Sequence, residues 1–473
     1  MTESKPLDQL FNPRSLAIVG DRRESNFYWA RSIQNADFKG LVYYVNTAVN
    51  QALGNKFYKS LLEIPESVDY VIVSVPAKIV PRIIADCAEK NVKFASIFSS
   101  GFSETGSEEG RKLEDQILKA AKGKVRVIGP NCMGVYCPRS GLAFRLDQSK
   151  RLGSVSFISQ SGGLSISFTL AGPRHGISFS KVVSYGNAVD IGDAELVNYL
   201  ANDPDTKIIA AYLEGTKNGQ RLIDALRNAS AKKPVIVWKG GRTTSGSKAV
   251  ASHTGSLAGS TEIWETVMRQ TRVVEVESLD ELIGTTKLFL FAPPSRGRGI
   301  ALVSISGGSS VVNTDAVIQS GLQVSGLAEE TKKALRSAVQ GVGTSVSNPI
   351  DIAGSFYNPD ILREVMTRIG EDSNIDAVIV EVAPLYLVSH SKNIRNYKLP
   401  SIIWSTLMQG LNHIRLILRK PVLVALVDIG YEKETRKLER TLTKSEIPCF
   451  QNVGSAAKAL SIFTKYHDAS LDL

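Results

Sequence analysis

The sequence predicts an α/β protein made of three doubly wound domains, each with a parallel sheet between helices. Its 473 residues correspond to about three domains, at roughly 150 residues each. A short β-branched run that ends in a turn of small residues occurs three times, around Gly20, Gly162 and Gly307, at spacings of 142 and 145 residues. Strand-like and helix-like segments alternate between these copies, which is typical of parallel sheets.

Further strands are expected in order along the chain, where short runs are rich in β-branched and aromatic residues. In the first third they cover residues 41–46, 70–76, 94–100 and 125–129. In the second third, strands over residues 180–186, 207–215 and 234–240 alternate with helices over residues 194–203 and 222–231. In the last third, strands are expected over residues 377–384, 401–406 and 421–430.

We place the three domains at residues 1–146, 147–292 and 296–473. The segment LFAPPSRGRG around Pro293 and Pro294 is the clearest linker, because proline and glycine interrupt regular structure. In open sheets of this kind, ligands bind beyond the carboxyl ends of the strands. The three recurring turns therefore predict where functional groups lie.

The distribution of charge argues against a nucleic-acid partner. The formal net charge of +10 would by itself suit nucleic acid or an anionic membrane. The excess divides evenly, as +4, +3 and +3, when the chain is split near residues 148 and 294, and no basic block stands out. This pattern suits a protein that handles anionic small molecules, and we expect neither a nucleic acid nor a membrane as a partner.

The cysteines and the N-terminal segment predict a cytoplasmic protein. The four cysteines are scattered and form no CxxC pair, so neither a disulfide scaffold nor a zinc site is expected. The N-terminal residues lack the apolar core of a signal peptide, and the longest apolar runs are too short to span a membrane.

His253 and Glu214 are the candidate catalytic pair. His253 lies in a stretch of Gly, Ser, Thr and Ala residues that leaves an imidazole accessible. Glu214 lies at the end of the expected strand over residues 207–215, where open sheets present reactive groups. A nucleophilic imidazole needs one nitrogen held by an acceptor, so that the other stays unprotonated and correctly aimed. Glu214 could supply that acceptor, although either residue taken alone suits an ordinary structural role.

The turn SQSGG is a candidate phosphate site. Ser161, Gly162 and Gly163 offer a hydroxyl group, a flexible backbone and the start of a helix, whose free N–H groups favour anions. The positive end of such a helix would suit a transient phosphohistidine.

These motifs resemble the α subunits of nucleoside-diphosphate-forming acyl-CoA synthetases, in the succinyl-CoA synthetase superfamily. The resemblance covers nearly the whole chain, and the pair YLEG and SHTGSLAG carries it most specifically. The other matching motifs are SLAIVG, SVPA, SSGFSETG, GPNCMGV, SQSGG, SYGNAVDIGDAELVNYLANDPDT, SISGG and NPIDIAG.

The resemblance implies a CoA-binding Rossmann-like domain followed by two flavodoxin-like ligase domains. It implies that acyl-CoA, phosphate and NDP are interconverted with acid, CoA and NTP through an acyl phosphate and a phosphohistidine. His253 matches the phosphorylated histidine, Glu214 the carboxylate that orients it, and Ser161–Gly163 the phosphate cradle. The positions that match the CoA site are Gly20, Asn46, Val75, Pro76, Ser100, Asn131 and Cys132.

The chain departs from the family pattern at the expected CoA phosphates. The loop after the first strand reads GDRRESNFYW, so that Asp21 brings negative charge and aromatic residues fill space that glycine would leave open. The proline and basic residue usual after the second strand are replaced by Thr47 and Ala48. Arg22 and Arg23 could substitute, because guanidinium groups pair well with phosphate, but a plain surface role suits them equally.

The family's nucleotide-binding part is an ATP-grasp module, for which this sequence leaves no room, and no P-loop is present. We therefore expect a separate ATP-grasp β subunit that carries the nucleotide and its Mg²⁺, in a dimer or an α2β2 assembly. The alternative is a non-catalytic regulatory protein of the same fold that binds CoA or a nucleotide. A Rossmann oxidoreductase is disfavoured, because GDRRES lacks the GxGxxG spacing and Asn46 ends the second strand where an acidic residue would be needed.

Overall fold

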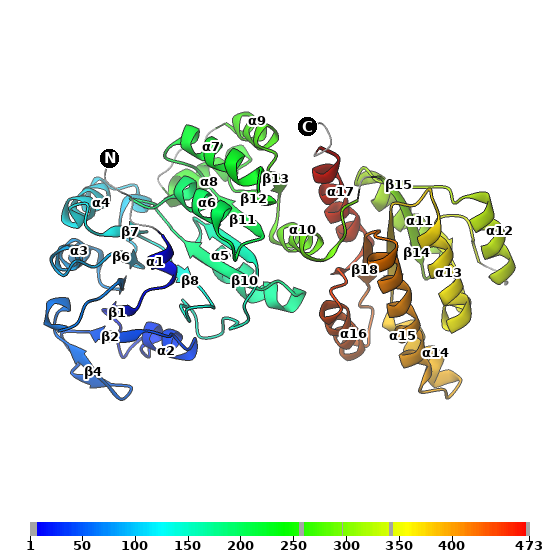
Figure 1. Ribbon diagram of the computed structural model, residues 1–473, viewed down its shortest axis with the longest axis horizontal. Coiled ribbons are helices and arrows are strands. Elements are labelled where there is room, and N and C mark those ends of the chain that lie inside the picture. Colours follow the sequence, from blue (N-terminus) through cyan, green and yellow to red (C-terminus); the bar gives the residue numbers. More distant parts are fainter. Residues whose placement is uncertain (1–6, 255–259, 296, 340–343, 470–473) are drawn as a thin grey trace. The chain divides into compact units, whose positions relative to one another are not determined.

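The computed structural model describes residues 7–254, 260–295, 297–339 and 344–469, and divides into two compact units. The first comprises residues up to 173 together with 177–278, and the second comprises residues 174–176 together with 279 onwards. Figure 1 shows that the first unit contains two sheets and the second unit one. The three-sheet α/β fold predicted from the sequence is confirmed.

The first sheet has seven strands in the order β3-β4-β2-β1-β5-β6-β7. Its strands pair in parallel except β3 with β4, and β1 is buried along its whole length. The strands are β1 (Ser15–Val19), β2 (Leu41–Val45), β3 (Gln51–Ala52), β4 (Asn55–Tyr58), β5 (Tyr70–Val73), β6 (Phe94–Ile97) and β7 (Arg126–Ile128). The α-helices of this region are α1 (Asp8–Phe11), α2 (Tyr28–Asn35), α3 (Val80–Glu89) and α4 (Glu108–Ala121).

The second sheet has six strands in the order β13-β12-β11-β9-β10-β8. They are β8 (Gly134–Tyr136), β9 (Val155–Ser159), β10 (Phe179–Ser184), β11 (Ile208–Leu213), β12 (Val235–Lys239) and β13 (Val274–Val276). The α-helices are α5 (Gly162–Ala171), α6 (Asp193–Asn202), α7 (Gly219–Ser230), α8 (Thr244–Thr254) and α9 (Thr261–Thr271). Strand β8 lies within the range that we assigned to the first domain, yet it pairs antiparallel with β10 and so completes the second sheet.

The sheet of the second unit has the order β15-β14-β17-β18-β19, with β16 also paired to β14. Its strands are β14 (Gly299–Ser304), β15 (Gln323–Val324), β16 (Ile350–Asp351), β17 (Ala377–Val382), β18 (Val422–Leu426) and β19 (Cys449–Phe450). Its α-helices are α10 (Leu279–Phe291), α11 (Gly307–Gln319), α12 (Glu329–Ala338), α13 (Pro359–Glu371), α14 (Pro384–Asn393), α15 (Leu399–Asn412), α16 (Glu432–Lys444) and α17 (Val453–Ala469).

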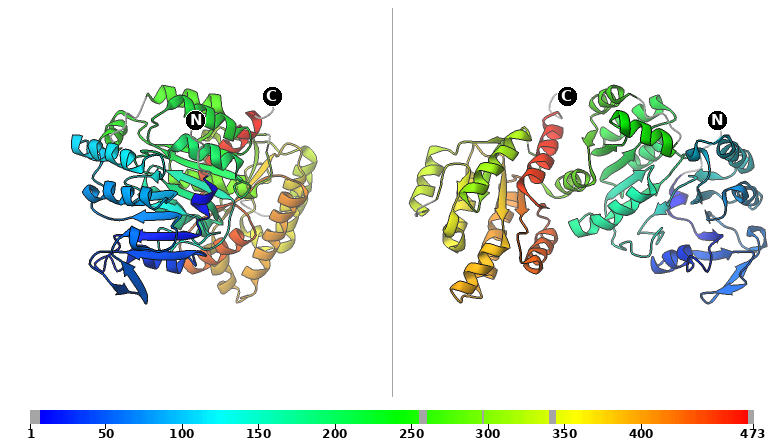
Figure 2. Two further views of the ribbon diagram at one scale, coloured as in Figure 1. Left: turned by 60° about the vertical axis from the view of Figure 1, so that its left-hand side comes forward. Right: turned by 180° about the vertical axis from the view of Figure 1, so that it is seen from behind.

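Alternate residues of β17 pack into two different cores, as a sheet covered on both faces requires. Val378 and Val380 join a core with α12, α13, α15 and α16, whereas Ala377 and Ile379 join a core with α10, α11 and α17. Figure 2 shows the helices of this unit from two further sides.

The expected strand over residues 401–406 is wrong, because these residues lie within α15. Their apolar side chains contribute to the core as a helix face, with Ile403 and Leu407 buried. Among the residues that the structure describes, no helix is both long and apolar enough to cross a membrane.

Candidate active site at the carboxyl ends of the second sheet

Glu214 lies where the sequence predicts it, immediately after β11, and only 5% of it is exposed. The Tyr212 hydroxyl group donates a hydrogen bond to Glu214 Oε1 at 3.1 Å. The Gln160 side-chain oxygen accepts hydrogen bonds from the backbone N–H groups of Glu214 and of Gly215, the latter at 3.0 Å. Glu214 is therefore held by Tyr212 from its own strand and by Gln160 from the end of the neighbouring β9.

The predicted phosphate turn is the N-terminus of α5. Ser161 is the N-cap, and its Oγ accepts a hydrogen bond from Leu164 N at 3.3 Å. Gly163 is open, since the nearest atom to a Cβ at this position would be Ser161 Oγ at 3.9 Å. The helix start thus offers free N–H groups beside Gln160, the residue that holds Glu214.

His253 lies near the C-terminal end of α8, and its side chain is outside the described residues, as is the motif segment 255–259. Helix α8 packs against the 3-10 turn η3 (Ser103–Thr105) of the SSGFSETG motif. The pairing of His253 with Glu214 stays a prediction.

Lys239, which we did not single out from the sequence, ends β12 beside Glu214. Its ammonium group donates to the Glu214 carbonyl oxygen at 2.9 Å and also to the Gly240 carbonyl oxygen. The group lies 5.1 Å from the ring centroid of Trp264. Burial lowers the pKa of Lys239 to about 8.

A cleft of about 1740 Å³ opens beside this edge, between the two sheets of the first unit. Asn187 lies in its wall and bridges the two sheet regions, because its side-chain amide donates to Glu104 Oε2 at 2.6 Å and to Glu114 Oε1 at 2.8 Å. The cleft extends from Gln160 and Gly215 along α4. This polar opening gives solvent and ligands access to the ends of β9 and β11.

The predicted CoA-binding residues all follow strands of the first sheet at its carboxyl edge. Gly20 follows β1 with a φ of +92°, and a Cβ there would lie 2.3 Å from the Ser74 carbonyl oxygen, so only glycine fits. The others follow β2, β5, β6 and β7; they are Asn46, Val75, Pro76, Ser100, Asn131 and Cys132. The structure brings these positions to one edge, and their contact with CoA stays a prediction.

Cys132 is a packing residue in this arrangement. Its side chain is buried, its thiol lies 3.4 Å from the Ile97 carbonyl oxygen, and burial raises its pKa to about 12. A thiol with so high a pKa is a poor nucleophile near neutral pH.

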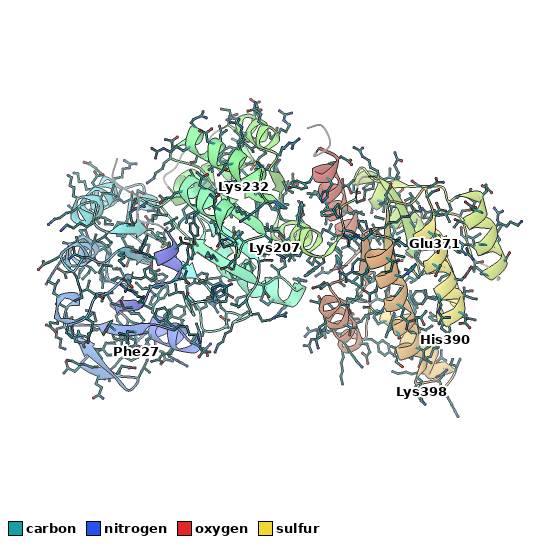
Figure 3. All side chains as sticks on the ribbon, viewed as in Figure 1. Phe27, Lys207, Lys232, Glu371, His390 and Lys398 are labelled. Carbon is teal, nitrogen blue, oxygen red and sulfur yellow. The ribbon has the colours of Figure 1, made fainter. Side chains whose placement is uncertain are left out.

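The Asp21 side chain binds the N-terminus of α2. It lies in the loop where the sequence departs from the family pattern for binding the CoA phosphates. Its Oδ2 accepts a hydrogen bond from Ala30 N at 2.8 Å, and its Oδ1 accepts one from Arg22 N at 3.2 Å. The neighbouring Phe27 is buried at the start of α2 (Figure 3). The chain's own carboxylate therefore occupies the anion position of this helix.

Gln160, Tyr212 and Lys239 complete the site, although sequence reasoning gave them no role. Gln160 lies in the SQSGG motif and Tyr212 in the YLEG motif, and this position was the signal by which the sequence could have pointed to them. Lys239 shows only as a charged residue at the end of an otherwise apolar strand.

Comparison with known proteins follows the same division of the chain. Residues 14–138 match the family described as CoA binding domain, and residues 152–289 match the family described as succinyl-CoA ligase like flavodoxin domain.

Two relatives match over most of this chain. The acetate–CoA ligase (ADP-forming) II subunit alpha of Pyrococcus furiosus is 35% identical over 466 residues, which cover 96% of this chain and 97% of the relative. The acetate–CoA ligase (ADP-forming) II of Archaeoglobus fulgidus is 37% identical over 386 residues. That match covers 79% of this chain but 56% of the relative, so the chain spans about half the length of this relative.

A solved structure shares the fold. The dinucleotide forming acetyl-coenzyme A synthetase 1 of Candidatus Korarchaeum cryptofilum, in complex with phosphate and ADP, superimposes with a TM-score of 0.82 at 30% identity, and the match covers 98% of each chain.

Proposed function

The chain belongs to the family of ADP-forming acetate–CoA ligases, and on that premise we propose that it is the α subunit of an acyl-CoA synthetase. The enzyme interconverts acyl-CoA, phosphate and NDP with a carboxylic acid, CoA and NTP. The relatives favour this catalytic function over a purely regulatory role in binding CoA. Acetate is the acid named for the Pyrococcus and Archaeoglobus relatives, and we propose it as the first substrate to test.

One observation carries the catalytic proposal. Gln160, directly before the helix cap Ser161, accepts hydrogen bonds from the backbone N–H groups of Glu214 and Gly215. This contact connects the candidate phosphate turn to the candidate orienting carboxylate. Glu214 and the α5 N-terminus thus belong to one site in the domain that resembles succinyl-CoA ligase.

The first step forms an acyl phosphate. A phosphate oxygen attacks the thioester carbonyl carbon of acyl-CoA, the C–S bond breaks, and CoA leaves as the thiolate. The free N–H groups at the α5 N-terminus stabilise the negative charge of the phosphate. The CoA nucleotide lies along the carboxyl edge of the first sheet, at the positions that follow β1, β2, β5, β6 and β7.

The second step moves the phosphoryl group to His253. An unprotonated imidazole nitrogen attacks phosphorus, the P–O bond to the acyl group breaks, and the carboxylic acid leaves as its anion. Glu214 accepts the hydrogen bond of the other ring nitrogen and stabilises the positive charge that develops on the ring. Attack of an NDP oxygen on the same phosphorus then yields NTP and free His253.

We place the nucleotide and its Mg²⁺ on a separate β subunit with an ATP-grasp fold, in a dimer or an α2β2 assembly. The naming of the Pyrococcus relative as subunit alpha supports a partner, and so does the additional length of the Archaeoglobus relative. The cytoplasm is the proposed location, because the four cysteines are free thiols.

Labelling of the assembled enzyme tests this function. The chain is produced with its partner subunit and given acetyl-CoA and ³²P-labelled phosphate, and the protein is assayed for an acid-labile, base-stable phosphoryl group. We expect labelling in the wild type and none in His253→Ala. The control is His390→Ala in the second unit, where His390 is labelled in Figure 3. His390 stacks on Tyr357, and we expect normal labelling of this variant. Equal labelling of wild type and His253→Ala contradicts the proposal.

A further inference from the structure

Lys239 is a buried cation that forms no salt bridge with any residue that the structure describes, although the carboxylates of Glu214 and Glu275 act on it from farther away. It is 4% exposed, and among the described residues its ammonium contacts are two carbonyl oxygens and the Trp264 ring. A buried charge that makes no direct salt bridge costs folding free energy, and proteins retain such arrangements chiefly where function needs them. Elsewhere in this sheet, the buried Lys181 pairs with Asp203 at 2.7 Å.

The contacts of Lys239 join three places in the chain. The Glu214 carbonyl belongs to the end of β11. The Gly240 carbonyl lies at the start of the segment from 240 to 261, which contains α8 and His253 and is called the His253 segment below. Trp264 lies on α9, just after that segment. One ammonium group therefore contacts the carboxylate's strand and both ends of the His253 segment.

A second contact joins the two ends of the segment that contains His253. The Thr261 hydroxyl group donates to the Arg242 carbonyl oxygen at 2.9 Å, which joins the two ends of the segment directly. The Arg242 guanidinium pairs with Glu277 at 2.8 Å. The two ends of this segment are thus anchored to the sheet independently of the residues around His253.

We propose that Lys239 is a positioning residue that fixes the start of the His253 segment relative to Glu214. The proposal rests on the proposed function, since it assumes that His253 carries the phosphoryl group and that Glu214 orients it. The ammonium group makes no contact with the substrate; it fixes the main-chain positions from which the two side chains extend. Without it, the backbone hydrogen bond from Gly240 N to the Leu213 carbonyl oxygen at 2.9 Å still joins the two strand ends, but the Glu214 and Gly240 carbonyl oxygens lose their shared donor and can shift. A displacement of about 1 Å can cost a hundredfold in rate.

Lys239→Met tests the proposal in the assembled enzyme. We expect the rate of His253 phosphorylation to fall by about ten- to a hundredfold. We expect the thermal midpoint to stay at or above that of the wild type, because the substitution removes the desolvation cost of a buried ammonium group. A purely structural lysine would give the opposite pattern, with lower stability and an unchanged rate.

Lys233→Met is the matched control. Lys233 lies just before the other end of β12, where its ammonium group donates to the carbonyl oxygens of Leu200 at 2.9 Å and Asp203 at 2.5 Å. This substitution also removes a carbonyl-bound ammonium group from the same strand region, and we expect it to leave the phosphorylation rate within twofold of wild type.

The pH profile supplies a second readout if Lys239→Met folds poorly. The charged groups that face Lys239 are Glu214 from the end of β11, Glu265 from α9, Glu275 from β13 and Arg242 from the start of the His253 segment. Lys239 loses its charge as the pH rises through about 8. We expect phosphorylation in Lys239→Arg to persist above pH 8 relative to the wild type, since arginine stays protonated.

The outcomes separate the two proposals. If the wild type does not label at His253, the proposed function fails. If the wild type labels and Lys239→Met labels at the same rate, the positioning role is wrong while the function stands. Superimposable pH profiles for the wild type and Lys239→Arg also overturn the positioning role.

Discussion

At the scale of single residues, Asp21 shows how one side chain changes the use of a helix end. The first turn of α2 has N–H groups that could bind a ligand phosphate, and Asp21 accepts a hydrogen bond from Ala30 there instead. Its carboxylate is 2% exposed, so it is part of the fold rather than of the surface. Under the proposed function, the CoA phosphates must find other partners, and the exposed Arg22 and Arg23 are the nearest cations in sequence.

Asp21→Ala should therefore lower stability. The substitution leaves the Ala30 and Arg22 N–H groups without their acceptor, and we expect a loss of about 1–2 kcal/mol in the free energy of unfolding. Urea denaturation of wild type and variant measures this loss. Glu24→Ala in the same loop is the control, because Glu24 is exposed, and we expect a change within about 0.5 kcal/mol. An undiminished free energy of unfolding in Asp21→Ala would show that the cap contributes nothing.

At the scale of elements, the candidate site depends on how the ends of β11 and β12 meet. Gly240 follows β12, and a Cβ there would lie 2.5 Å from the Tyr212 hydroxyl group on β11. The same hydroxyl group donates to Glu214. The absence of a side chain at residue 240 thus lets the tyrosine reach the carboxylate.

Gly240→Ala should displace the Tyr212 hydroxyl group and loosen Glu214. Overpacking of this kind costs about 1–3 kcal/mol of stability, and we expect phosphorylation of His253 to slow by about tenfold. A phosphoryl-labelling time course and a urea denaturation curve measure the two effects. Gly219→Ala is the control, since no atom lies within 4 Å of a Cβ at that position. If both variants label as fast as the wild type, the contact between Gly240 and Tyr212 has no bearing on the site.

Much of the fold could be predicted because buried parallel strands and their turns are local patterns. The same locality explains the misassigned residues 401–406, since a short apolar run suits a buried helix as well as a strand. Glu214 and Ser161 could be placed because each follows its strand directly. Lys239 could not, because its contact with Glu214 joins strands that lie 25 residues apart in sequence. Asp21 stood out as a charge, but its hydrogen bond to α2 needs the folded loop.

At the scale of the whole molecule, the first two sheets form one unit because charged groups join them across the end of β7. Arg126 pairs with Asp190 at 2.9 Å and with Glu195 at 2.7 Å, both in the region of the second sheet. Backbone contacts follow the same path, with Ile191 N donating to the Val127 carbonyl oxygen at 3.1 Å. These contacts therefore fix the candidate CoA-binding edge relative to the candidate phosphohistidine site.

Arg126→Ala should weaken the connection between the two sheets. Arg126 is 17% exposed at its side chain, and its loss leaves two partly buried carboxylates without their guanidinium partner. We expect the first unit to lose about 2–3 kcal/mol of stability, at the upper end for hydrogen bonds to charged groups. Urea denaturation followed by tryptophan fluorescence reports on both sheet regions, because Trp29 lies on α2 and Trp238 on β12.

The control for Arg126 is Arg139→Ala, which removes a guanidinium group that pairs within the region of the second sheet. Arg139 pairs with Asp205 at 2.7 Å, but its side chain is 57% exposed, so solvent screens the pair. We expect that substitution to cost less than about 1 kcal/mol. Should the two variants lose equal stability, the partly buried cluster around Arg126 is not what joins the sheets, and the backbone contacts between residues 127 and 191 carry the connection. If instead Arg126→Ala splits the transition into two steps, the cluster is what makes the two sheet regions unfold together.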